Sequence, residues 1–331
     1  MADTELEALS AYLQLLDSFG VDGIIVQDLA VAALARKVAP NLPLHGSTQM
    51  TVADLDGVRF LEANGFTQAV LSRELSAQEI RFIASQSSIP IEVFIHGASC
   101  MAYSGQCLMS SFLGGRSGNR GACAQPCRQP YTLLCDGQPV MKHEAYVLSL
   151  KDLKSLDYID DLLDAGVTSF KIEGRMKSVY YVAAVVAAYR KAIDAYYAEG
   201  GAYRVRPEWR EELEKVSHRP YTTAFAFQNP DHSAQEYVKS QPEQPYDFVG
   251  LILPGHGEEG TNRVQQRNHF KVGEILEYLT PRGQVGLVKI TRLVNQEGEE
   301  VDKAPHPLEE LTMTGDRTLP AFSILRRRAK K

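Results

Sequence analysis

The first half of the chain alternates short apolar runs with amphipathic stretches of helical periodicity. The apolar runs are rich in β-formers and occupy residues 22–28, 42–49, 67–75, 91–97 and 168–175. The first four start about 20–25 residues apart, with an amphipathic stretch between them, and this spacing is typical of βα units. The stretch after the second run carries an N-cap signal at Thr51 and a helix stop at Gly65. The pattern therefore predicts an α/β domain with a parallel sheet.

A closed (β/α) barrel needs eight strands, and the pattern offers fewer. Besides the five clear runs there is an ambiguous one, "AYVLSL" at 145–150, and a helical stretch at 4–20 precedes the first run. We therefore expect a TIM-like (β/α) barrel that is incomplete at the N-terminus. Its open edge leaves backbone groups unpaired, which predicts a homodimer or a heterodimer.

The second half of the chain changes character after residue 200. The longest helical stretch, 178–197, ends there, and the residues that follow are mostly polar. From residue 246 short apolar runs alternate with turn signals, as in small all-β barrels. We expect three parts: a partial (β/α) barrel at 1–200 with a cysteine loop at 98–130, a connector at 201–245, and a small β-barrel at 246–331.

Composition is that of a soluble globular protein, with 44% hydrophobic and 23% charged residues in a chain of 331. The acidic start lacks the basic and apolar regions of a signal peptide, and no run reaches the ~18 apolar residues of a membrane span. These features predict a cytoplasmic protein with no membrane association. The net charge of −6 argues against unspecific nucleic-acid coating and is compatible with a local basic site.

Four of the five cysteines are concentrated in one loop, with the spacing Cys100-x6-Cys107-x15-Cys123-x3-Cys127. Cys100 follows a predicted strand directly, at the end where βα folds place their chemistry. A segment of this length without regular secondary structure usually has a function or is held together by internal cross-links. The fifth, Cys135, lies in an alternating run that leads into an Asp136–Gly137 turn, so we expect it to stand apart from the other four.

Three interpretations of this cysteine loop compete. Inert buried cysteines are disfavoured, because the loop is polar and rich in glycine. Structural zinc sites usually contain close cysteine pairs, and only Cys123 and Cys127 have that spacing. An iron–sulfur cluster also takes four thiolates and accepts diverse spacings. The spacing of the cysteines alone therefore supports a zinc site and an iron–sulfur cluster equally.

Polar residues at the predicted strand ends form a second candidate site. In a barrel they converge on one mouth beside the cysteine loop, although each is also explained as a helix cap, an inner polar group or a surface ion pair. Arginines of this set and of the loop, including Arg128, suit bidentate binding of a carboxylate or phosphate. The substrate-binding candidates are His45, Gln49, Arg73, Glu74, His96, Arg116, Arg120, Lys171, Glu173 and Arg175.

Hydrolase motifs fail on inspection. "HEAYV" at 143–147 has Val147 where a zinc-protease motif has its second histidine, and "GRSGN" at 115–119 ends in Asn119 instead of glycine. His96 and Cys100 are four residues apart, but neighbours in a turn rarely form a nucleophile–base pair. The sequence therefore contains no credible proteolytic apparatus.

Long motifs identify a family. "EVFIHGASCMAYSGQCLMS" (92–110), "GRSGNRGACAQPCRQPY" (115–131) and "FKIEGRMKSVYYVA" (170–183) resemble the collagenase-like peptidase family, as does "QQRNHFKVGE" (265–274) in the C-terminal part. The resemblance implies a (β/α) barrel with an inserted cysteine loop and a following small β-barrel. It also implies a [4Fe–4S] cluster on Cys100, Cys107, Cys123 and Cys127. The family begins with further βα units that this sequence lacks.

The branch with this C-terminal domain resembles tRNA hydroxylation proteins, which convert the wobble uridine to 5-hydroxyuridine and draw on prephenate. Our first hypothesis is therefore iron–sulfur-dependent hydroxylation of tRNA. The second is a collagenase-like protease, and the third is an accessory subunit that needs a partner chain. In the first case the C-terminal domain is expected to assist RNA binding without catalytic groups, through Arg263, Arg267, Asn268, His269 and Lys271.

Overall fold

The computed structural model describes residues 3–228, 230–255 and 259–329. It divides the chain into two compact units, Met1–Glu173 with Arg219–Gln241, and Gly174–His218 with Pro242–Lys331. These units do not follow the expected ranges, because the long helix after residue 178 and the residues up to 218 belong with the C-terminal barrel. None of the helices in the described parts of the chain is long and apolar enough to cross a membrane.

The first unit contains the expected parallel sheet. Five parallel strands lie side by side in the order β1 (Ile24–Val26), β2 (Leu44–Gly46), β3 (Gln68–Val70), β4 (Ile91–Ala98) and β8 (Ser169–Ile172). Their order confirms the predicted βα succession. The ambiguous run at 145–150 is not a strand and has only isolated bridges at Ala145 and Leu150. The next strand is β7 (Asp152–Lys154), which pairs antiparallel with the end of β4 and parallel with β9 (Tyr221–Thr222).

The main helices of this unit are α1 (Asp3–Ser18), α2 (Leu29–Val38), α3 (Leu55–Ala63), α4 (Ala77–Gln86) and α6 (Ile159–Asp164). The side chains of Asp28, Asp54 and Ser76 cap α2, α3 and α4. The prediction of Thr51 as a cap is wrong, because the Asp54 carboxylate accepts the Gly57 N–H and starts α3, and Thr51 lies earlier in a left-handed conformation. The stop at Gly65 is confirmed by its φ of +79°.

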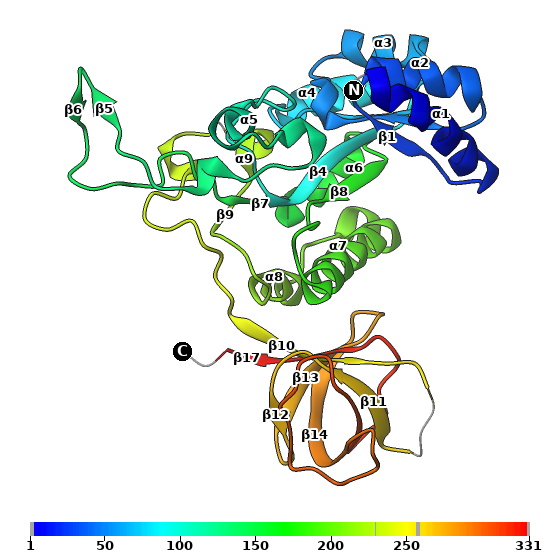
Figure 1. Ribbon diagram of the computed structural model, residues 1–331, viewed down its shortest axis with the longest axis vertical. Coiled ribbons are helices and arrows are strands. Elements are labelled where there is room, and N and C mark those ends of the chain that lie inside the picture. Colours follow the sequence, from blue (N-terminus) through cyan, green and yellow to red (C-terminus); the bar gives the residue numbers. More distant parts are fainter. Residues whose placement is uncertain (1–2, 229, 256–258, 330–331) are drawn as a thin grey trace. The chain divides into compact units, whose positions relative to one another are not determined.

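The sheet buries one face and leaves the other partly open. In β4, Ile91, Val93 and Ile95 are buried, whereas the alternating Glu92 and Phe94 are partly exposed. Helices α1 to α4 form one layer, with α1 against α2 and α3 against α4 (Figure 1). The sheet does not close, and among the described strands β1 pairs only with β2. This unit is therefore α/β with an open, mainly parallel sheet.

The cysteine segment has little regular structure. It contains α5 (Met109–Gly114) and two single 3₁₀ turns, Gly118–Arg120 and Pro126–Arg128. It continues into a hairpin of β5 (Leu134–Cys135) and β6 (Gln138–Pro139). Asp136 and Gly137 between these strands both have positive φ, +50° and +75°. The predicted Asp–Gly turn is therefore confirmed.

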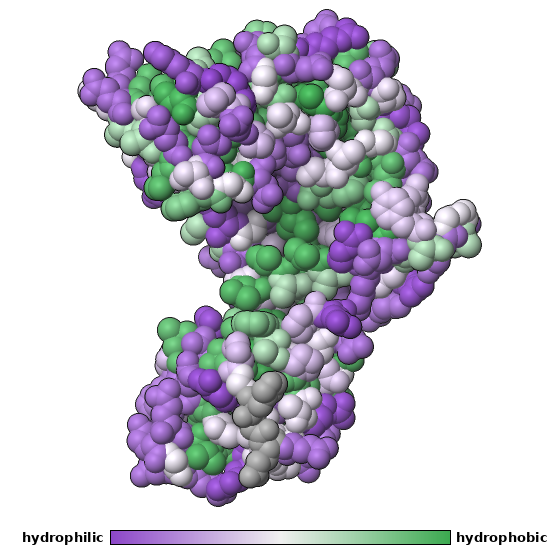
Figure 2. All heavy atoms as spheres, turned by 90° about the vertical axis from the view of Figure 1, so that its right-hand side faces the viewer, coloured by the Kyte–Doolittle hydropathy of each residue, from purple (hydrophilic) through white to green (hydrophobic). Residues whose placement is uncertain are grey.

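The second unit holds α7 (Val179–Glu199), α8 (Pro207–Glu214) and a closed barrel. The barrel strands, in spatial order, are β10 (Tyr246–Ile252), β11 (Thr261–Gln266), β16 (Glu310–Gly315), β14 (Val285–Val294), β13 (Ile275–Leu279) and β17 (Ile324–Arg328). A separate ribbon pairs β12 (Phe270–Lys271) with β15 (Lys303–Ala304). The expected small all-β barrel is confirmed. Hydrophilic residues dominate the face of the barrel that Figure 2 shows.

Charged side chains bind the barrel to α8. Arg326 of β17 is fully buried, and its guanidinium lies 2.7 Å from Glu212 of α8 and 2.6 Å from Glu277 of β13. Lys215 reaches the same two carboxylates at 2.9 and 3.0 Å. This four-residue network explains why the helix pair and the barrel form one unit.

Candidate functional site

Four cysteines surround one pocket at the carboxyl end of the parallel sheet. Cys100, Cys107, Cys123 and Cys127 all line a cavity of about 490 Å³. Burial raises the pKa of the Cys127 thiol; nearby Arg128 lowers it, and the other three sulfurs raise it further. We call this cavity the four-thiol pocket.

Cys135 does not line this pocket. It is exposed on the hairpin strand β5, with its sulfur 4.0 Å from the Asp136 carboxylate. All five cysteines are free thiols. Across the described ranges, no three His, Cys, Asp or Glu side chains converge into a site ready for a single metal ion. The four thiols thus surround a space and do not meet at one point.

Polar residues after the strands hold the cysteine segment in place. Thr51 Oγ1 donates to Ser104 O at 2.8 Å, and Gln49 Nε2 donates to Gly118 O at 3.5 Å. Gly105 has a φ of +79°, and a Cβ atom there would lie 2.2 Å from Gln49 O, so no other residue fits without a shift. Gln49, a substrate-binding candidate, therefore contacts the loop backbone in this structure.

Arg73 and Glu74, which follow β3, form hydrogen bonds to the turn that contains Cys100. Arg73 Nη1 donates to Ala98 O at 3.0 Å, before this cysteine. Glu74 Oε1 accepts the N–H and the hydroxyl of Ser104, after it, at 2.9 and 3.1 Å. These contacts fix both ends of the turn. They are the local reason why Cys100 faces the pocket.

Arg128 holds the cysteine loop in place through hydrogen bonds. It donates to Ser149 Oγ and Ser99 O, both at 2.9 Å, and to Leu150 O. Arg116 is exposed and donates to Ala122 O at 3.0 Å within the loop.

The other predicted site residues lie elsewhere. His96 is buried on β4 against the Tyr221 ring, with centroids 5.4 Å apart, and Lys171 forms an ion pair with Glu92 at 2.6 Å. Arg120 pairs with Glu5 of α1. The remaining candidates are His45 on β2 beside Gly23, Glu173 at the end of the first unit, and Arg175 in the second unit. Of the ten candidates, Gln49 and Arg73 line the four-thiol pocket.

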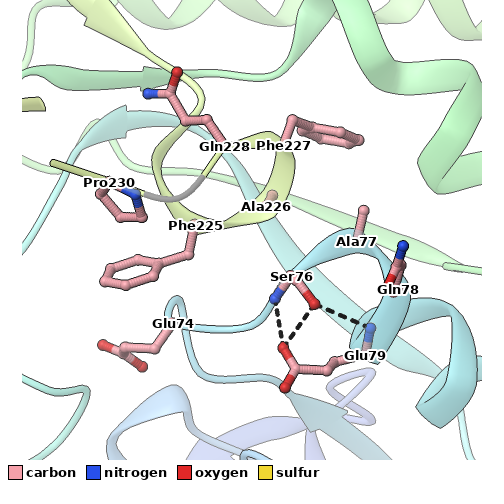
Figure 3. A pocket seen from close by; sticks show the side chains of 10 residues that line it. All are labelled: Glu74, Ser76, Ala77, Gln78, Glu79, Phe225, Ala226, Phe227, Gln228 and Pro230. Atoms are coloured by element: carbon pink, nitrogen blue, oxygen red, sulfur yellow. Dashed lines mark hydrogen bonds between the residues drawn. The ribbon is translucent and has the colours of Figure 1, made fainter. Parts of the chain in front are cut away.

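A second pocket of about 480 Å³ lies beside α4 and α9 (Ala224–Phe227). Figure 3 shows the Phe225 ring and the Glu74 side chain on one side of it, and the capping box of Ser76 and Glu79 on the other. A narrow cavity of about 50 Å³, lined by Arg73, Cys100, Glu74 and Phe225, shares residues with both pockets. Residues 221–228 were not among the predicted site residues, because their sequence carries no recognisable catalytic or ligand-binding motif.

Exposed apolar side chains surround the mouth of the four-thiol pocket. Met101 and Tyr103 are 41% and 48% exposed, and Leu108 is 70% exposed. Phe112, on the neighbouring helix α5, is 89% exposed. Large apolar residues exposed together are unusual on a soluble surface and mark contact sites.

An open α/β sheet with a four-thiol pocket, joined to a closed six-stranded barrel, defines a cysteine-loop protein with an appended β domain. The sequence matches Peptidase family U32 over residues 1–236 and the Peptidase family U32 C-terminal domain over residues 244–326. The chain belongs to peptidase family U32.

Relatives in this family carry different names. The tRNA hydroxylation protein P1 of Bacillus subtilis is 38% identical over 328 residues, covering 97% of this chain and 78% of that protein. The 23S rRNA 5-hydroxycytidine C2501 synthase of Escherichia coli is 43% identical over 229 residues, covering 67% of this chain and 35% of that protein. A collagenase of Porphyromonas gingivalis is 33% identical over 238 residues, covering 67% of this chain and 56% of that protein.

Proposed function

We propose that the chain is an iron–sulfur-dependent RNA hydroxylation protein that converts the wobble uridine of tRNA to 5-hydroxyuridine. The observation that carries the proposal is the set of four thiols around one pocket, in a chain 38% identical to a tRNA hydroxylation protein. The first unit is then the incomplete (β/α) barrel, with the pocket at its mouth. In βα folds, chemistry gathers at this end of the strands.

The donor set suits a [4Fe–4S] cluster held by Cys100, Cys107, Cys123 and Cys127. The four thiols line one cavity, and four cysteine thiolates are the donor set of a [4Fe–4S] cluster. The Gln125 N–H donates to Cys123 Sγ at 3.3 Å, a type of bond that stabilises ligating sulfurs. When bound, the cluster would supply one-electron chemistry.

The pocket rim suits an unstacked nucleobase. Single-stranded RNA is recognised by stacking of its bases on aromatic side chains, and Tyr103, which lines the pocket, is half exposed, while Phe112 is exposed on α5. Prephenate, a dicarboxylate, is the proposed co-substrate. Arg116 is exposed on the cysteine loop and is the candidate for binding one of its carboxylates.

Mass spectrometry of tRNA nucleosides tests the function. A deletion strain is expected to lack 5-hydroxyuridine and its derivatives, and the wild-type gene is expected to restore them. The Cys100→Ser gene should fail to restore them, whereas Cys135→Ser, which lies outside the pocket, should succeed. Unchanged nucleosides in the deletion strain would refute the proposal.

The protease alternative has its basis in the family name and the Porphyromonas relative. The described residues give little support to a protease, because His96, the histidine nearest to Cys100 in sequence, is only 1% exposed. Gelatin cleavage that requires Cys100, together with unchanged tRNA, would favour this alternative. Dimerisation and the role of an accessory subunit stay predictions, for which the unpaired edge of β1 is the structural reason.

The ribbon of β12 and β15 is the proposed RNA contact of the second unit. Lys271 stands directly opposite Lys303, and like charges in this position destabilise a strand pair. Arg267 and His269 are exposed close by in sequence, in a chain of net charge −6. Arg263, expected to contact RNA, instead pairs with Glu310 at 3.0 Å. A concentration of positive charge that costs stability is explained by phosphate binding.

We expect the triple variant Arg267→Ala, Lys271→Ala, Lys303→Ala to weaken tRNA binding for all sequences alike. Its log Kd should depend less steeply on log salt, by up to about 0.9 for each phosphate that the variant no longer neutralises. Arg292→Ala is the control, because this exposed arginine of the same barrel is already paired with Glu300. Binding measured across a salt series checks this, and equal slopes for the triple variant and the control would contradict it.

A further inference from the structure

Arg73 is a partly buried cation without a carboxylate partner. Its guanidinium carbon lies 3.8 Å from the centroid of the Phe94 ring, and its one hydrogen bond from the guanidinium to the described residues goes to Ala98 O. The charges of Glu173 and Glu74 act on it from a distance, but neither carboxylate forms an ion pair with it among the described residues. A guanidinium stays charged at any physiological pH, so its burial costs free energy unless an anion compensates.

The four-thiol pocket is a site for that anion. Arg73 and Cys100 both line this pocket, and both also line the narrow cavity of about 50 Å³. Several guanidinium N–H donors remain for a ligand in the pocket, because one bond to Ala98 uses only one of five.

Arg128 provides a contrast within the same loop. It is also buried beside the thiols, but its guanidinium donates to Ser149, Leu150 and Ser99. These hydrogen bonds offset the cost of burying the Arg128 charge, and they fix the loop. No comparable set of backbone acceptors surrounds Arg73 among the described residues.

The geometry points to Arg73 as the positioning residue that compensates the negative charge of a thiolate-bound cluster and raises its reduction potential. This inference rests on the cluster of the proposed function. A cubane held by four thiolates is anionic and becomes more so on reduction, so a fixed positive charge beside it favours the reduced form. Nearby charge and hydrogen bonds to sulfur are the means by which proteins tune such potentials.

Redox titration of the reconstituted full chain tests this. Arg73→Met and Arg73→Gln should shift the reduction equilibrium at least tenfold toward the oxidised form, about 59 mV to lower potential for a one-electron couple. Arg73→Lys, which keeps the charge, should recover most of the shift. Arg59→Met is the matched control, because it removes the same charge from an exposed position on α3, outside the four-thiol pocket, and should leave the potential unchanged.

Each outcome is decisive. If the wild-type chain binds a cluster and the potentials of the neutral Arg73 variants shift no more than that of Arg59→Met, the role of Arg73 is overturned and the proposed function stands. Wild-type chain that binds no iron after reconstitution would overturn both. If a folded neutral Arg73 variant loses its iron, Arg73→Lys decides: iron and potential close to those of the wild type support the inference, and loss of iron from Arg73→Lys as well overturns it. If Arg73→Met does not fold, Arg73→Gln decides on the same terms.

Discussion

Serine in place of Cys100, Cys107, Cys123 or Cys127 is expected to reduce bound iron and acid-labile sulfide to background after anaerobic reconstitution. Each of these thiols lines the same pocket, and a four-thiolate cluster needs all of them. A serine hydroxyl does not ionise near neutral pH and is a poor substitute for a thiolate. Absorbance of the thiolate-to-iron charge-transfer bands and metal analysis provide the measurement.

Cys135→Ser is the matched control for this series. It makes the same chemical change in the same segment, but on an exposed hairpin strand outside the pocket. It should retain the full iron content. If this variant loses iron while any one of the other four keeps it, the ligand assignment is wrong. Zinc bound in place of iron, in the wild-type chain purified without oxygen, would revive the structural zinc alternative.

The strands of the first unit could be predicted because the order of apolar and polar residues within each strand shows which side chains are buried. In β4, side chains alternate between the helix layer and the open face, so Ile91, Val93 and Ile95 produce a period of two. The antiparallel strand β7 and its neighbour β9 lie outside the regular succession of apolar runs and helices that marks β1 to β4. Their pairing joins segments far apart in the sequence, which no local pattern predicts.

The candidate site was predictable only in part for a similar reason. The spacing of the cysteines alone supported a zinc site and an iron–sulfur cluster equally. The resemblance of the motifs to the family then implied an iron–sulfur cluster on four named cysteines. Which strand-end residues face a substrate and which hold the loop depends on distances that a sequence does not contain. Arg120 illustrates this, because its partner Glu5 lies 115 positions away. Thr51 looked like a helix cap and instead holds Ser104.

The boundary between the units depends on one buried arginine. Arg326 lies in a run of basic residues that resembles a solvated tail, yet its side chain is fully buried between Glu212 and Glu277. Burial alone would lower its pKa, but hydrogen bonding and charge from Glu212 reverse this and raise it. Because these contacts reach from β17 to α8, the helix pair belongs with the barrel.

We expect Arg326→Met to lower the free energy of unfolding of the second unit by about 3–5 kcal/mol, because it leaves buried carboxylates short of a counter-charge. Arg263→Met is the matched control: it removes the same side chain from an exposed ion pair with Glu310 on the same barrel, and should cost no more than about 1 kcal/mol. Denaturant unfolding followed by circular dichroism measures both. Equal, small effects would show that the network is not a determinant of stability.

The pH dependence of unfolding gives an independent check on the same network. Burial raises the pKa of Glu212, but hydrogen bonding and charge from Arg326 and Lys215 outweigh it, so the net pKa lies below the ordinary value of 4.5. A carboxyl group with a lowered folded-state pKa stabilises the fold above its unfolded pKa, and this stability is lost as pH falls through the lower, folded value. The wild-type chain should therefore lose stability in acid below about pH 4.5, whereas Arg326→Met, already deprived of the pairing, should lose less over that range. Parallel acid profiles of the two proteins would mean that Arg326 does not hold Glu212 in its ionised form.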